Sequence, residues 1–371
     1  MIMNKLKIIN IQLQQGSAIV AAMLCLPIML AFFALAVDIG YYYVVRNELQ
    51  NAADAAALAG AENLVRNIGE LTAPDFNTAR IKALSVIPLN QANNSNLSNG
   101  QIANGYWDVT GKYRGLLPAI GSDTSITYYP AIEVTIKKEN SDNNGPFRSF
   151  FGATMLGINT INMQAKAVAV TGGPGAINKD LIPIALGSCI FTNPPTGTFS
   201  TGTLYSKGGS NCYTGQWTTY SNKSNSNSVL KRLVNYATGI EINPSPAQLT
   251  ISQKIWIQTG VKAIDFKLID ACSAINGNSR CAYMVVPVVS GSVSTNTQKQ
   301  IMGFACVKVL NVTGTGSSTT INLQLILPEN SDGSINSNYT AHCQIGPTSS
   351  FGPGYGAKIS PRLVNYSGND Y

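Results

Sequence analysis

The sequence predicts an α+β protein with an N-terminal transmembrane helix that continues into a long soluble helix, then a small α+β domain, then a mainly β, disulfide-bonded C-terminal domain. Three observations predict this organisation. An uncharged apolar run, 18–37, has about the 20 residues of one bilayer crossing. Helix-forming residues continue beyond it to about Arg66. Six of the 7 cysteines lie in the C-terminal half, among short segments typical of strands.

The apolar run predicts a single-pass span with its N-terminus in the cytoplasm. Lys5 and Lys7 precede it without an acidic residue, and short basic segments stay in the cytoplasm. Three tyrosines, 41–43, stand where an aromatic belt meets the headgroups. We therefore expect 1–17 in the cytoplasm, 18–43 in the membrane, and the bulk of the chain outside.

A cleaved signal peptide is the main competing interpretation of this segment. Ala34-Leu35-Ala36 has the small-x-small pattern of a cleavage site. The apolar run, however, exceeds the roughly 7–15 residues of a signal-peptide core, and helical sequence continues through the site. These features favour an uncleaved anchor.

Two features of the long helix invite a functional interpretation. Asp38 ends the apolar run, where a carboxylate must reach headgroup water or a partner. Small residues from Ala52 to Ala61 allow another backbone to approach closely, either a partner helix or the chain's own soluble domain.

The next predicted domain, 44–171, combines helices and strands. A helix begins near Thr72, Pro74 and Asp75 and ends at Pro88. Residues 103–109 are a short strand candidate that contains Tyr106 and Trp107, and alternation of apolar and polar residues predicts strands at 132–137 and 161–169. The segment 146–156 has the pattern of a short amphipathic helix.

A Gly- and Pro-rich stretch, 172–179, is the predicted linker to the β-rich domain, 180–371. One helix is expected there, at 228–237. The expected strands are 181–186, 198–205, 255–258, 263–268, 283–289, 302–310 and 319–326.

The even number of cysteines in the C-terminal half predicts three disulfides in an oxidising compartment. The candidates are Cys189, Cys212, Cys272, Cys281, Cys306 and Cys343. Fifteen pairings exist for six cysteines, and pairing of sequence neighbours (189–212, 272–281, 306–343) is the simplest. A set of buried free thiols would fit the same cysteine content.

The rest of the composition gives little sign of catalytic or ligand chemistry. The net charge is +7 with only 12% charged residues, and the basic residues are scattered rather than gathered in the stripe that nucleic acid requires. His342 is the single histidine, without a nucleophile motif. No cysteine pair has zinc-site spacing. We expect no catalytic residue, cofactor, metal or nucleic-acid partner, and we interpret Asp123–Thr127 and Gly352–Gly356 as turns.

The N-terminal third resembles the TadE/TadG-like family of Flp (Tad) pilus-assembly proteins. The resemblance rests on Gly16-Ser17-Ala18, the Pro27-containing span, Leu35–Gly40 and Leu49–Ala61. It is weaker at Trp107-Asp108, at Phe150-Phe151, along 161–169 and at Pro361–Val364. The family-motif residues that follow from it are Asp38, Gly40, Asn51, Asp54 and Gly60.

The resemblance implies a bacterial inner-membrane protein whose soluble region lies in the periplasm. It implies a non-enzymatic part in pilus assembly or anchoring, through contacts with other Tad proteins or pilins. Pseudopilins of this family have a glutamate five residues after the cleavage-site glycine, whereas Ala21 follows Gly16 here. The departure favours an uncleaved TadG-like protein over a minor pseudopilin. Outside this family, an exported adhesin and an exported hydrolase are also compatible with the sequence.

Overall fold

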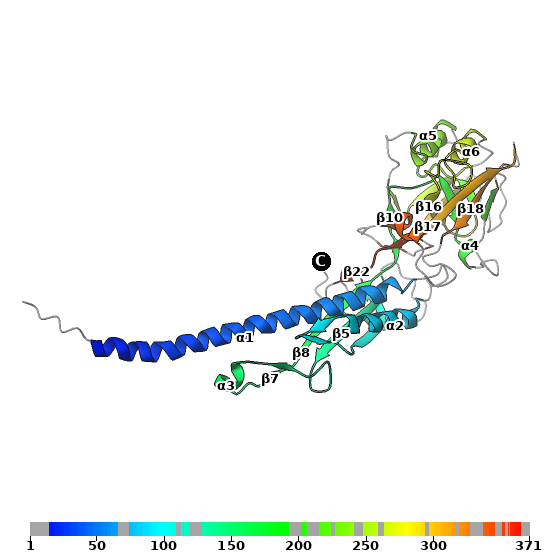
Figure 1. Cartoon of the computed structure of the whole chain (residues 1–371). Coiled ribbons are helices and arrows are strands. Elements are labelled where there is room, and N and C mark those ends of the chain that lie inside the picture. Colours follow the sequence, from blue (N-terminus) through cyan, green and yellow to red (C-terminus); the bar gives the residue numbers. More distant parts are fainter. Residues whose placement is uncertain are drawn as a thin grey trace, which may run out of the picture. The chain divides into compact units, whose positions relative to one another are not determined.

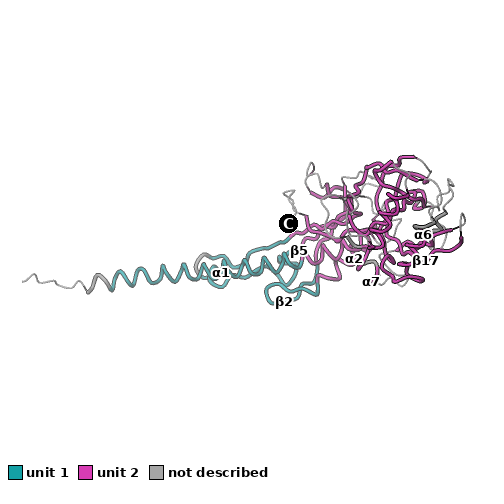
Figure 2. Tube along the Cα trace, turned by 90° about the horizontal axis from the view of Figure 1, so that it is seen from above, with its two compact units in different colours: residues 1–52, 88–99, 136–165 teal, residues 53–87, 100–135, 166–371 magenta. Residues whose placement is uncertain are grey.

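The computed structural model describes most of the chain between residues 15 and 364. The described residues are 15–65, 74–108, 113, 115–118, 128–192, 202–205, 215–223, 227–240, 248–258, 263–293, 297–315, 319–326, 337–345, 351–352, 355 and 357–364. The chain forms two compact units (Figure 2). Unit 1 comprises 1–52, 88–99 and 136–165, and unit 2 comprises 53–87, 100–135 and 166–371.

Helix α1 runs without a break over Gln15–Glu62, 48 residues that extend about 72 Å (Figure 1). It contains Pro27, as a membrane helix tolerates. The helix ends slightly before the predicted Arg66. Its last carbonyl groups accept tighter bonds: Asn63 and Leu64 donate their N–H groups to the carbonyl oxygens of Gly60 and Ala61, three residues back.

Unit 1 adds two short hairpins to α1. The first joins β1 (Gln91–Ala92) to β2 (Ser95–Asn96). Asn93 and Asn94 both have φ of 56°, the left-handed conformation of a type I′ turn, which asparagine tolerates. The second joins β6 (Phe147–Arg148) to β7 (Thr160–Ile161) and carries α3 (Gly152–Leu156) at its tip.

The helix predicted over 146–156 is therefore wrong in its first half. Phe147 and Arg148 pair with Ile161 and Thr160 as a strand, and only Gly152–Leu156 is helical. The apolar spacing of this segment fits both structures. The hairpin partner, which lies on the far side of the loop, decides between them.

Unit 2 contains most of a five-stranded sheet beside α2 (Phe76–Val86). The strand order is β22 (Arg362–Val364), β8 (Met163–Val170), β5 (Tyr128–Lys138), β3 (Gln101–Asp108) and β4 (Leu117–Pro118). Asp75 is the N-cap of α2, accepting from the Thr78 N–H at 2.9 Å, so the cap is not Thr72, which lies outside the described residues. A 3₁₀ turn, Ile87–Leu89, follows at Pro88. Strands were expected at the positions of β3, β5 and β8.

The larger sheet of unit 2 has seven strands. Their order is β12 (Gly202–Tyr205), β18 (Thr320–Leu325), β17 (Thr297–Thr313), β16 (Tyr283–Val289), β11 (Ile184–Gly187) and β13 (Gly215–Trp217), with β15 (Lys254–Ile257) paired to β17. Strands β11 and β16 pair in parallel, whereas the other neighbours along this order pair antiparallel.

Short elements complete unit 2. The segment expected as a linker contains β9 (Gly173–Pro174) and β10 (Ala176–Ile177), which are buried. They pair with β20 (Phe351–Gly352) and β14 (Leu249–Thr250), and β19 (Gln344–Ile345) pairs with β21 (Lys358–Ile359). The predicted domain limits remain predictions. The short helices are α4 (Cys189–Thr192) and α7 (Ser337–His342).

Both faces of the large sheet are covered. Along β16, Met284 and Val286 face one apolar cluster, whereas Val285 and Val289 face another. The first cluster includes residues of α5 (Asn227–Ala237), a helix that the sequence predicts, and of α6 (Ala263–Asp270). Burial on both faces explains why β16 is almost continuously apolar.

The strand predicted at 263–268 is wrong, because α6 occupies these residues. Ile264, Phe266 and Leu268 alternate in the sequence as in a strand, but among the α6 side chains whose burial is described, Phe266 and Ile269 are the buried ones, three residues apart on one helical face. The Phe266 ring packs against Trp217 at 5.4 Å between ring centroids. Tertiary packing thus selects the helical period.

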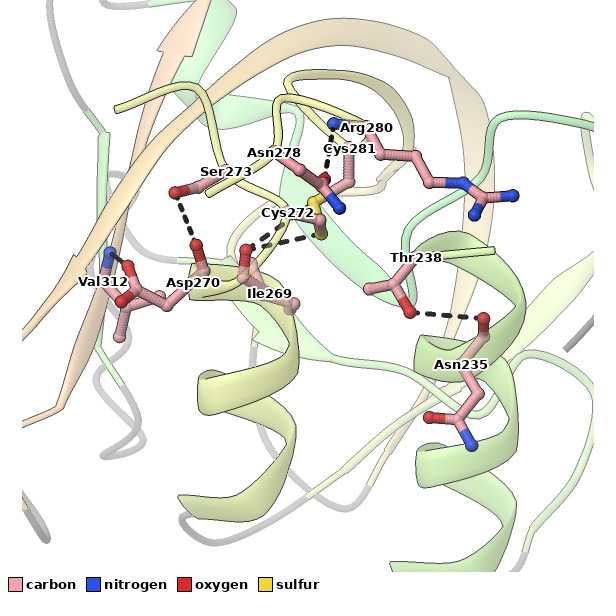
Figure 3. The surroundings of a disulfide bond; sticks show 10 residues. All are labelled: Asn235, Thr238, Ile269, Asp270, Cys272, Ser273, Asn278, Arg280, Cys281 and Val312. Carbon is pink, nitrogen blue, oxygen red and sulfur yellow. Dashed lines mark hydrogen bonds between the residues drawn. A yellow bond between two sulfur atoms is a disulfide. The ribbon is translucent and has the colours of Figure 1, made fainter. Parts of the chain in front are cut away.

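Two of the predicted disulfide pairs are present, Cys272–Cys281 and Cys306–Cys343. Figure 3 shows the first at the end of α6, where both sulfur atoms approach the Ile269 carbonyl oxygen, at 3.4 and 3.6 Å. Nearby, the Asp270 carboxylate accepts the Val312 N–H at 2.9 Å. Cys189 is also disulfide-bonded, and its predicted partner Cys212 lies outside the described residues. Cys25 is free and exposed.

Candidate functional site

Asp38 holds a loop of unit 1 against the helix at the end of the apolar run. One carboxylate oxygen accepts the N–H groups of Phe151 (3.0 Å) and Gly152 (2.7 Å), and the other accepts that of Phe150 (3.0 Å). The Ser149 hydroxyl donates to the same carboxylate at 2.9 Å. We call this arrangement the Asp38 clamp. Asp38 is only 8% exposed, so its ligands are groups of its own chain rather than bulk water.

The chain at the clamp is shaped for this contact. The N–H groups that begin α3 have no partner within the helix and point toward an acceptor, as at any helix N-terminus. Ser149 accepts the Ala153 N–H at 3.1 Å while it donates to Asp38. A Cβ at Gly152 would collide with the Ser149 Oγ, so this position favours glycine. Figure 1 shows α3 beside α1.

Tyr41 and Glu48 attach further segments of unit 1 to α1. The Tyr41 hydroxyl donates to the Asn93 side-chain oxygen at 2.7 Å, and the Glu48 carboxylate accepts the Asn93 N–H at 2.8 Å. The Tyr41 ring also lies 5.5 Å from the Phe147 ring and 5.6 Å from the Phe150 ring, between centroids. Both hairpins of unit 1 are therefore fixed to the turns of α1 that follow the apolar run.

In unit 2, the end of α1 packs closely on other elements through small residues. A Cβ at Gly60 would lie 3.1 Å from the Ala79 carbonyl oxygen, the Ala83 Cβ and the Ile132 Cγ2. Replacing Gly60 would thus push α1 away from α2 and β5. Ala53, Ala56, Ala57 and Ala61 are fully buried. This small-residue face packs within the chain itself.

The other family-motif residues have different surroundings. Gly40 has no atom within 4 Å of a Cβ built upon it, so space does not require glycine there. Asn51 is exposed and Asp54 is half-buried on α1. The structure therefore brings Asp38 and Gly60 into tight contacts and leaves Gly40 and Asn51 on the helix surface.

Lys358 binds the C-terminal end of α1. Its side chain is 3% exposed, and its Nζ donates to the Glu62 carbonyl oxygen (2.6 Å) and to the Glu62 carboxylate (2.7 Å). A buried cation at this end of a helix satisfies a free carbonyl group and complements the helix dipole. The sequence gives no local signal for this contact, because the two residues are 296 positions apart.

A polar pocket of about 270 Å³ lies in the C-terminal part of unit 2. Lys179, Arg280 and His342 line it together with Tyr283, and the Tyr283 and His342 rings stack at 4.7 Å between centroids. Cys343, next to His342, is held in a disulfide and offers no thiol. Among the described residues, no group of three or more His, Cys, Asp or Glu side chains is placed to hold a metal.

Comparison with known proteins identifies the segment that contains the clamp aspartate and the small-residue face. Residues 16–63 match the Tad family, described as putative Flp pilus-assembly TadE/G-like. The TadE/TadG-like resemblance is thereby confirmed for this segment. The match supports a part in Flp pilus assembly. No curated protein and no solved structure matches the chain.

The matched segment contains the α1 side of the contacts of Asp38, Tyr41, Glu48, Gly60 and Glu62, and their partners lie outside it. Ser149, Asn93 and Lys358 are the residues that sequence reasoning did not single out. Two signals pointed to the loop: the Phe150-Phe151 pair, to which the family resemblance extends, and the helical pattern of 146–156, of which Gly152–Leu156 is helical. An Asn-Asn pair between short polar strands was the signal for the β1–β2 turn.

Proposed function

We propose that this chain is a non-enzymatic, membrane-anchored component of Flp pilus assembly or anchoring. In this proposal, residues 18–43 cross the bacterial inner membrane once with the N-terminus in the cytoplasm. The remainder of the chain stands in the periplasm and binds other Tad pilus-assembly proteins or pilins. The family match of residues 16–63 supports the pilus role.

The observation that carries the proposal is the change of surroundings along α1. The helix is long and apolar enough to cross a membrane, and almost none of its apolar part is buried within the chain. Met23, Phe32 and Phe33 are 70%, 68% and 63% exposed. Large apolar side chains in this number cannot face water without cost, whereas lipid accepts them. From Val45 onward, buried residues recur at helical spacing.

The cysteines support the periplasmic side. Cys272–Cys281 and Cys306–Cys343 are bonded, and disulfides persist in the bacterial periplasm but are rare in the cytosol. The position of Lys5 and Lys7 before the span supports the same orientation.

Fractionation of cells that produce the full chain with a C-terminal tag tests the anchoring. We expect the protein to stay in the membrane after alkaline carbonate washing. We expect protease to remove the tag in spheroplasts and to spare it in intact cells. Release by carbonate contradicts the anchor, and tag loss from intact cells indicates an exported adhesin instead.

Pilus counts test the role, and the intact mass separates it from that of a minor pseudopilin. Deletion of the gene should remove surface Flp pili, and the full chain should restore them. A mass that begins at Ser17 would indicate a processed pseudopilin, and one that begins at Val37 a secreted protein. Unchanged pili in the deletion strain contradict a part in assembly.

A further inference from the structure

The loop held by the Asp38 clamp presents large apolar side chains to the outside. Phe150, Phe151 and Ile158 are 64%, 44% and 46% exposed. They lie within nine residues of one another, and residues 149–165 contain no charged side chain. Single exposed apolar residues are ordinary, but a cluster of this kind marks a contact surface.

The clamp places this surface at the level where the apolar run ends. Asp38 follows Val37, the last residue of that run, and it binds the N–H groups of Phe150 and Phe151 directly, both at 3.0 Å. With the span placed as proposed above, both phenylalanines lie beside its outer end, about one turn before the tyrosines at 41–43. Trp and Tyr side chains concentrate at this depth in membrane proteins. Tyr43, on the following turn of α1, is 55% exposed as well.

Burial along α1 indicates that the covered face extends into the apolar run. Ala34, one turn before Asp38 on the same helical face, is 7% exposed. Its neighbours Phe33 and Leu35 are 63% and 43% exposed. The covered face of α1 therefore extends about 6 Å from Asp38 toward the N-terminus of the helix, at 1.5 Å per residue.

The loop backbone is also hydrogen-bonded as contact with lipid demands. Besides the three N–H groups bound by Asp38, Ser149 donates to the Asn159 carbonyl oxygen (3.3 Å), Thr154 to that of Phe151 (3.1 Å) and Ile158 to that of Gly152 (3.1 Å). In hydrocarbon, a backbone N–H group without a hydrogen-bond partner costs roughly several kcal/mol of free energy. These groups are satisfied within the chain.

We propose that the clamped loop, residues 149–158, rests beside the span in the periplasmic leaflet of the inner membrane. Phe150, Phe151 and Ile158 are then in contact with the acyl chains. Exposed Arg148, immediately before the loop, lies within reach of the phosphates. Lipid is the occupant that the structure favours, because Phe150 and Phe151 are bonded to Asp38, directly after the exposed apolar run that ends at Val37. The proposal rests on the anchoring proposed above.

Lipid quenching of tryptophan fluorescence tests the contact in the full chain, reconstituted in phosphatidylcholine vesicles with or without brominated acyl chains. The test variant is Phe150→Trp. Ile275→Trp is the matched control, since Ile275 is also 64% exposed but lies in the C-terminal part of unit 2. Phe33→Trp, 63% exposed within the apolar run, reports the span. Each signal is compared with that of the unmodified chain.

We expect brominated lipid to remove much of the added fluorescence of Phe150→Trp and Phe33→Trp and none of that of Ile275→Trp. Quenching of Phe33→Trp alone overturns the loop proposal while leaving the anchor intact, and points to a protein as the occupant of the cluster. No quenching of Phe33→Trp overturns the anchor itself. Phe151→Trp repeats the test should Phe150→Trp misfold.

Discussion

The two halves of α1 share one backbone geometry and have opposite surroundings. Between residues 19 and 37, large apolar side chains are exposed all round the helix, except at Ala34 and the half-buried Ala31. From Val45 onward, the buried positions form a stripe at helical spacing, and Ala and Gly dominate it. The first half thus has the surface of a helix that could span a membrane, whereas the second is shaped for close approach of protein backbone.

Asp38 marks the change between the halves. A carboxylate next to an apolar run requires ligands, and the loop supplies four donors. The loop in turn requires an acceptor for the first N–H groups of α3. The carboxylate and the N–H groups therefore satisfy each other's hydrogen-bonding requirement. The clamp is accordingly the first contact to test.

The largest effect is expected from Asp38→Ala. The change removes the acceptor of three N–H groups, and hydrogen bonds to charged groups contribute about 1.5–3 kcal/mol each. The free energy of opening the loop should fall by about 3 kcal/mol or more. Backbone amides of the loop should then exchange roughly 100-fold faster. Hydrogen–deuterium exchange of residues 149–158 in lipid nanodiscs measures it. Ile39→Ala, at a 47% exposed neighbour, is the control, and equal exchange in both variants contradicts the clamp.

A glycine pair within α1 compares the two surroundings directly. Valine at Gly60 meets atoms 3.1 Å from its Cβ, and overpacking of this kind lowers the free energy of unfolding by about 1–3 kcal/mol. Valine at Gly40 meets nothing within 4 Å, and the change should be near zero or slightly stabilising. Thermal unfolding of the detergent-solubilised chain, followed by circular dichroism, measures both. Equal melting temperatures would contradict the close packing at Gly60.

Lys358→Met tests the far end of α1. It removes two charge-assisted bonds to Glu62, whose carboxylate, 37% exposed, can still be hydrated. We expect a loss of about 1–2 kcal/mol in the free energy of unfolding. Lys166→Met is the matched control, because its bridge to Glu133 is similarly short (2.9 Å) but the lysine is 42% exposed, and a loss of about 0.5 kcal/mol is expected. Chemical unfolding in the same detergent compares the free energies of unfolding of the two variants. Equal losses would contradict a larger contribution from the buried Lys358.

The smallest effect is expected from Tyr41→Phe. It removes one hydroxyl, which donates to Asn93, and keeps the ring that packs beside Phe147 and Phe150. A single neutral bond contributes about 1 kcal/mol. Tyr43→Phe, at a 55% exposed position, should change nothing measurable in the same unfolding experiment. If both variants have the same free energy of unfolding, the Tyr41 hydroxyl does not help to hold the β1–β2 hairpin.

Much of the fold follows from local patterns in the sequence. Continuous apolar and Ala-rich residues predict α1, and strict alternation predicts β5. These patterns work because a helix or strand buries one face with a period of its own. The two wrong assignments, at 146–156 and 263–268, are short segments whose spacing fits both periods.

The site was predictable from one side only. Asp38 stood out because a carboxylate beside a span needs ligands, yet its donors are uncharged groups, mostly of the backbone, more than 100 residues away. Backbone N–H groups leave no mark on the sequence, so no pattern could identify them. The same holds for the Glu62 carbonyl oxygen that binds Lys358.

Local sequence is enough to predict the apolar run, the helix that continues it and the strands with clear alternation, since each depends on residues close along the chain. Only the tertiary structure decided which loop Asp38 holds, that Gly60 meets α2 and β5, and that β22 at the end of the chain pairs with β8. Those contacts join distant segments through shape and backbone polarity, which folding brings together and the order of residues does not display.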